Sequence, residues 1–70
     1  MDKQRILSKI THREKEIIKL LAQGLTTTQI GQKLDISPIT VITHRNNLRI
    51  KLKCKNCPEL IFKASQLGLL

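Results

Sequence analysis

The sequence predicts an all-α domain of four helices, and three observations lead to that prediction. Apolar residues recur at the spacing of helical turns in successive segments of the chain. Three segments open with a capping residue that is followed three positions later by Glu or Gln; the pairs are Thr11 and Glu14, Thr26 and Gln29, and Asn56 and Glu59. No stretch has the pattern of a strand, and 70 residues make one small domain.

The first eight residues carry no strong periodic signal. We therefore expect residues 1–8 to form an N-terminal tail or linker and residues 9–70 to form the folded domain. Ile6, Leu7 or Ile10 is expected to dock from this segment onto the core.

The first helix is expected to begin at Thr11, whose hydroxyl can cap it. Ile17, Leu20 and Leu21 share one face of this helix, and Gly24 provides the stop at its C-terminal end. This face should pack into the core.

The second helix is expected over residues 27–34, with its cap at Thr26 and with Ile30 and Leu34 in the core. Gly31 lies in its middle, where glycine costs about 1 kcal/mol relative to alanine. We expect a packing reason for this glycine, namely the close approach of a neighbouring helix.

The third helix follows a connection of two residues, which is long enough only for a tight turn. Ser37 can cap it and Pro38 suits its first position, so we place it over about residues 38–53. A short helix, a tight turn and a longer basic helix form the helix-turn-helix order. Helical spacing turns one set of side chains inward and the opposite set outward; the inward set is Val41, His44, Leu48 and Leu52, and the outward set includes Ile39, Ile42, Thr43, Asn46 and Ile50.

The fourth helix is expected over about residues 57–67, with Asn56 as its cap and Gly68 as its stop. Its inner face carries Leu60, Ala64 and Leu67, and Phe62 falls on the opposite side.

The charge of the chain predicts a polyanionic partner. The formal net charge is +8, from 13 Lys and Arg against 5 Asp and Glu. No acidic residue lies between Asp35 and Glu59, where five cations occur. Phe62 is the only aromatic residue, which argues against a base-stacking platform for single strands. No apolar run approaches the ~20 residues of a membrane span and no signal peptide is apparent, so we expect a cytoplasmic, nucleoid-associated protein that does not bind membranes.

The two cysteines, Cys54 and Cys57, form a single C-x-x-C. A zinc site would need two further ligands, and the two histidines are far away in the sequence, so we expect free thiols, no metal and no cofactor. The chain is not expected to be an enzyme, because no carboxylate pair, activated nucleophile or ligand cluster converges.

Several sequence segments together resemble the LuxR-type helix-turn-helix domain, the GerE and NarL-like family. The resemblance covers residues 7–70 without a gap. The matching segments are residues 10–17, 23–26, 29–34, 36–38 with Thr40 and Val41, His44 with Lys51 and Leu52, and 64–69. It implies a four-helix transcription regulator of the LuxR family, either freestanding or the output domain of a response regulator. The helix after Ser37 would lie in the major groove of double-stranded DNA.

The resemblance also implies a homodimer that reads two half-sites and pairs through its last helix, with Ile61, Phe62 and Ser65 at the interface. The alternative for Phe62 is packing against the tail or the first helix. RNA polymerase is a further candidate partner. The chain departs from the family at Ile39 and Ile42, where lysine is frequent; apolar side chains there can touch thymine methyl groups, which favours an A·T-rich site.

The expected DNA contacts fall into two sets. The base contacts are Ile39, Ile42, Thr43 and Asn46. The phosphate contacts are Thr26, Thr27, Thr28, Thr40, Arg45, Asn47, Arg49 and Lys51. The alternative function is a helical protein-interaction module that docks on an acidic partner of the transcription machinery.

Overall fold

The computed structural model describes residues 3–70 and contains five helices and no strand in that range. The helices are α1 (Lys3–Ser8), α2 (His12–Ala22), α3 (Thr27–Leu34), α4 (Pro38–Leu52) and α5 (Cys57–Gln66). The last four correspond to the four predicted helices, and their ends agree with the prediction to within one residue. None of the helices over residues 3–70 is both long enough and apolar enough to cross a membrane.

Helix α1 was not predicted, because the segment was expected to be a tail or linker. It has six residues, none of them fully buried, so it lacks the apolar stripe from which a helix is recognised in a sequence. The expected docking is observed: Ile6 and Leu7 are half-buried against the core, and Ile10 belongs to it.

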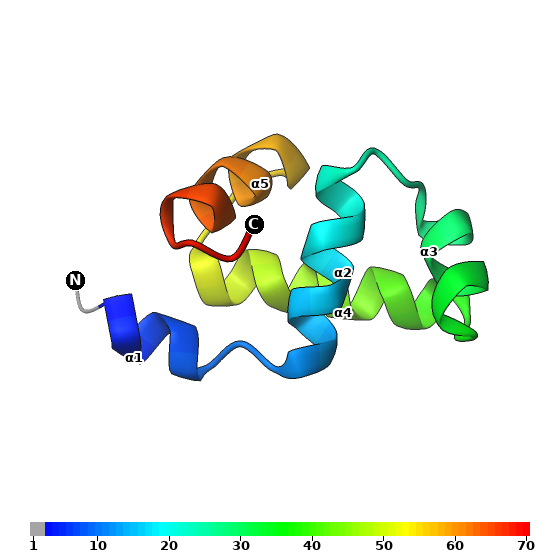
Figure 1. Ribbon diagram of the computed structural model, residues 1–70, viewed down its shortest axis with the longest axis horizontal. Coiled ribbons are helices and arrows are strands. Elements are labelled where there is room, and N and C mark those ends of the chain that lie inside the picture. The colour runs from blue at the N-terminus through cyan, green and yellow to red at the C-terminus, as the bar shows by residue number, and fades with distance from the viewer. Residues whose placement is uncertain (1–2) are drawn as a thin grey trace.

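Helix α4 is the central element of the fold. It packs against α2, α3 and α5. Figure 1 shows α2 crossing α4, with α3 at the N-terminal end of α4 and α5 near its C-terminal end. The core consists of apolar side chains from all four predicted helices and from the segments beside them: Ile10, Ile17, Ile18, Leu20, Leu21, Ile30, Val41, Leu48, Leu52, Leu60, Ala64 and Leu69.

The N-terminal caps of these helices were predicted correctly. In both α2 and α3 the capping threonine and the third helical residue bond to each other: Thr11 N donates to Glu14 Oε1 at 2.9 Å and Thr26 N donates to Gln29 Oε1 at 2.9 Å, and both hydroxyls accept a backbone N–H in return. Ser37 accepts from the backbone N–H of Ile39, and Asn56 from that of Glu59. The caps fix where the chain enters each helix.

The C-terminal ends use the left-handed conformation. Gly24 and Gly68 adopt φ values of +90° and +77° after α2 and α5, as their positions predicted. Asp35 and Lys53 adopt φ values of 57° and 56° after α3 and α4, where no glycine is available. Residues with a Cβ are disfavoured in this conformation, so both turns carry some backbone strain.

Gly31 marks the closest backbone approach in the helix-turn-helix. A Cβ at this position would lie 2.7 Å from the carbonyl oxygen of Ile36 and 3.3 Å from the nitrogen of Pro38. The expected packing reason for this glycine is therefore confirmed. What approaches is the turn and the first residue of α4.

Candidate nucleic-acid interface

Helix α4 has one face in the core and the opposite face in solvent. Val41, Leu48 and Leu52 are buried, whereas the side chains of Ile39 and Ile50 are 74% and 73% exposed. We use the term reading face for the outward set, which consists of Ile39, Ile42, Thr43, Asn46 and Ile50; Thr43 is exposed and Ile42 and Asn46 are half-buried. The structure thus brings the four predicted base-contacting residues together on one side of α4 and leaves none of them buried.

Ile50 was not among the predicted base contacts. It lies about three turns after Ile39 on the same side of α4, as the helical spacing had placed it. Large exposed apolar side chains are informative when they cluster. Ile39 and Ile50 lie toward opposite ends of the reading face and extend its apolar character along α4.

The two polar side chains of the reading face are held by bonds within the protein. The hydroxyl of Thr43 donates to the carbonyl oxygen of Ile39 at 3.1 Å. The amide oxygen Oδ1 of Asn46 accepts from Nη1 of Arg49 at 3.2 Å. Both side chains therefore have a defined orientation before any ligand is bound.

Arg49 was predicted to contact phosphate, but its guanidinium is bonded within the domain. Nη2 donates to the carbonyl oxygen of Lys55 at 3.0 Å, in the connection after α4. Nε is buried and has no hydrogen-bond partner among the described residues.

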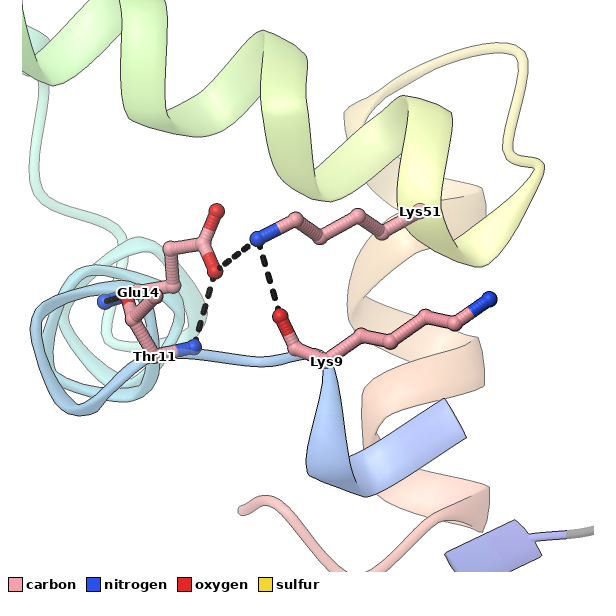
Figure 2. Close-up of polar contacts among 4 residues, drawn as sticks. All are labelled: Lys9, Thr11, Glu14 and Lys51. Carbon is pink, nitrogen blue, oxygen red and sulfur yellow. Dashed lines mark hydrogen bonds and ion pairs between the residues drawn. The ribbon is translucent and has the colours of Figure 1, made fainter. Parts of the chain in front are cut away.

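Lys51 was also predicted to contact phosphate, and its ammonium likewise turns inward. Its Nζ lies 2.7 Å from Oε1 of Glu14 and donates to the carbonyl oxygen of Lys9 at 2.9 Å. Figure 2 shows the Lys51 side chain reaching from α4 to Glu14 on α2 and to the segment that follows α1. The periodicity of α4 could not reveal this, because Glu14 is 37 positions away in the sequence.

Glu14 is only 2% exposed. Burial alone would raise the pKa of this carboxyl, but the hydrogen bond and charge of Lys51 and the bonds from Thr11 outweigh it and hold the pKa below its usual value. The carboxylate thus completes the cap of α2 and joins α2 to α4.

The remaining predicted phosphate contacts lie at the start of α3 and along α4. Thr26, Thr28, Thr40 and Asn47 are exposed, and Thr27 and Arg45 are half-buried. The hydroxyl of Thr26 is already used as the cap of α3. His44, which was placed on the inner side of α4, is half-buried.

Helix α5 exposes the aromatic ring that was singled out in the sequence. Phe62 is 65% exposed, so most of its surface is left uncovered by the described residues, which disfavours packing against the tail or the first predicted helix. Ser65 is exposed, and Ile61 is half-buried against the core. Phe62 and Ser65 are free to meet a second molecule.

Both cysteines are free thiols. Burial raises the pKa of the Cys54 thiol, whose Sγ donates to the carbonyl oxygen of Leu52 at 3.4 Å. Over residues 3–70, no group of three His, Cys, Asp or Glu side chains is placed to hold a metal ion.

Comparison with known proteins gives a consistent result. Residues 8–64 match the model of the family described as bacterial regulatory proteins, luxR family. The chain is 38% identical over 55 residues to the transcriptional regulatory protein FixJ of Rhizobium meliloti, covering 79% of this chain and 27% of FixJ. It is 40% identical over 56 residues to the nitrate/nitrite response regulator protein NarL of Escherichia coli K12, covering 80% of this chain and 26% of NarL.

A solved structure agrees with these relatives. The response regulator ChrA of a heme-sensing two-component system superimposes with a TM-score of 0.84 at 39% identity, covering 87% of this chain and 30% of that one. The chain therefore spans less than a third of the length of these three relatives.

Proposed function

The chain belongs to the luxR family of bacterial regulatory proteins, and from that membership we propose that it is the DNA-binding domain of a transcription regulator. Helix α4 enters the major groove of double-stranded DNA, and α3 and the turn before α4 set its angle. The observation that most supports this function is the reading face, none of whose residues is buried although the opposite face of the same helix forms the core.

Bases are contacted by the reading face. Asn46 pairs with adenine, since a side-chain amide can both donate to N7 and accept from N6 of that base. Ile39 and Ile42 contact thymine methyl groups, and Thr43 contributes its methyl group because its hydroxyl proton is bonded to Ile39. The preferred site is therefore A·T-rich.

Phosphates are contacted from both sides of the groove. The proposed set is Thr26, Thr27, Thr28, Thr40, Arg45 and Asn47. Arg49 and Lys51 are left out of this set, because both side chains are bonded within the domain.

The regulator binds as a homodimer to two half-sites. The exposed Phe62 supports pairing through α5, together with Ile61 and Ser65. The domain acts either alone or as the output domain of a response regulator in the bacterial cytoplasm, with RNA polymerase as a further partner. It performs no catalysis of its own.

The test is selection of bound sequences from random duplex DNA with the purified chain. We expect enrichment of an A·T-rich motif that occurs as two related half-sites, and binding that weakens steeply with salt. Enrichment of no motif would overturn sequence-specific binding. Binding to an acidic protein partner that persists at about 0.5 M salt, without binding to duplex DNA, would support the protein-interaction alternative instead.

A further inference from the structure

We propose that Arg49 is a positioning residue for base recognition, which holds the side-chain amide of Asn46 in the orientation that reads the base. This inference rests on the proposed function, because it concerns how the reading face selects a sequence. It assigns to Arg49 a role in specificity in place of the phosphate contact that its charge suggested.

The guanidinium is fixed at two points. Nη1 donates to Oδ1 of Asn46 one turn earlier in α4, and Nη2 donates to the carbonyl oxygen of Lys55 beyond the end of α4. The distances are 3.2 Å and 3.0 Å. The planar fork of arginine makes both bonds with one rigid group, which the single ammonium of a lysine cannot reproduce.

The bond also decides which way the amide of Asn46 faces. A guanidinium has only donors, so it can face only the oxygen of the amide. The amino group of Asn46 has no hydrogen bond within the described chain and keeps both N–H donors for a base. Oδ1 retains its second lone pair, so the pairing with adenine that needs one donor and one acceptor stays available.

Preorganisation explains why this arrangement helps recognition. A free asparagine would lose side-chain freedom on binding and could present either its oxygen or its amino group to the base. Held by Arg49, Asn46 presents its hydrogen-bond donors and acceptor to the base in one fixed orientation. A phosphate contact by Arg49 could use only the N–H groups left over on Nη1 and Nη2, because its third nitrogen is buried and the other two already hold Asn46 and Lys55.

The test uses Arg49→Met, with Arg45→Met as the matched control on the same flank of α4. Affinity is measured for the selected duplex and for a random duplex over a range of salt concentrations. For Arg49→Met we expect the preference for the selected duplex to fall about 3- to 10-fold, as for loss of one hydrogen bond, with random-duplex affinity and salt slope unchanged. For Arg45→Met we expect both affinities to fall alike and the salt slope to decrease by about one unit.

Three further measurements separate the positioning role of Arg49 from its charge and from its effect on folding. Arg49→Lys keeps the charge but loses the fork, so we expect it to lose the preference as Arg49→Met does. In an Asn46→Ala background, Arg49→Met should change the preference no further. Thermal unfolding of each variant shows whether it is folded, and Arg49→Gln replaces Arg49→Met if that variant is not.

Three results would overturn the inference. These are a lower salt slope in Arg49→Met with an unchanged preference, restoration of the preference by Arg49→Lys, and full additivity of the two substitutions. They differ from failure of the proposed function, in which the unaltered chain itself would prefer no sequence.

Discussion

Asn46 and Asn47 are adjacent in the sequence but have different surroundings. Asn46 lies on the reading face and accepts a hydrogen bond from Arg49, whereas Asn47 is exposed on a flank of α4. Under the proposed function, Asn46 reads a base and Asn47 anchors the backbone, and only the first of these contacts carries sequence information.

Asn46→Ala is expected to cost about 1–3 kcal/mol of binding free energy at the selected site and little on random DNA. The loss comes from the bidentate contact to a base, which random sites rarely offer. Titration of both duplexes at one salt concentration measures it. Asn47→Ala is the control and should weaken both complexes to a similar degree; an equal loss on both duplexes for Asn46→Ala would contradict its role in reading bases.

At the scale of single elements, the connection between α3 and α4 depends on the absence of a side chain at Gly31. Gly31 allows the backbone of Ile36 to approach α3, and the turn continues through Asp35 in the left-handed conformation. The angle between the two helices of the motif is therefore set by backbone contacts, which tolerate little change.

Gly31→Ala is expected to destabilise the domain by about 1–3 kcal/mol, although alanine is the better helix former by about 1 kcal/mol. The new Cβ would lie 2.7 Å from a backbone oxygen, so the turn must shift. Chemical denaturation measures the change. Gln32→Ala, at the exposed neighbouring position, is the control and should alter stability by less than about 0.5 kcal/mol. A more stable Gly31→Ala would show that the turn can move freely.

At the C-terminal end of α4, by contrast, we expect a substitution that stabilises the domain. Lys53 adopts φ 56°, a conformation that disfavours side chains with a Cβ, so Lys53→Gly is expected to stabilise the domain by about 0.5–1 kcal/mol. Thermal unfolding measures the effect. Lys55→Gly removes the same charge at a residue without a positive φ, so it should bring no gain. Equal changes in both variants would attribute the effect to charge.

At the scale of the whole molecule, the features that were predicted from the sequence are those that depend on residues close together in the chain. The caps at Thr11, Thr26, Ser37 and Asn56 involve residues two or three positions apart, and the two faces of α4 follow from helical spacing, so all of these were predicted correctly. Base and phosphate contacts remain predictions that the DNA experiments test.

What the sequence did not predict depends on tertiary structure. The pairing of Glu14 with Lys51 joins residues 37 positions apart, and local spacing assigned each of them an independent role. The bond from Arg49 to Lys55 spans a left-handed turn at Lys53, where no glycine signals one. Helix α1 is too short and too exposed for its periodicity to be detected.

The pair of Glu14 and Lys51 makes the stability of the whole domain dependent on pH. Because folding lowers the pKa of Glu14, the unfolded chain binds a proton more readily, and the stabilisation is complete above the unfolded pKa of roughly 4–4.5. It is lost as the pH falls through the lower pKa of the folded state. Acid therefore weakens the connection between α2 and α4.

Glu14→Gln is expected to lower stability by about 1–3 kcal/mol near neutral pH, since Lys51 loses its charged partner but can still turn partly toward solvent. The difference from the unaltered chain should shrink as the pH falls below about 4, because protonation removes the same charge. Thermal unfolding between about pH 7 and pH 3 measures this convergence. Glu16→Gln, which breaks only exposed pairs with His12 and Arg13, should change stability by less than about 1 kcal/mol. A gap between Glu14→Gln and the unaltered chain that stays constant with pH would mean that packing, and not charge, is what Glu14 supplies.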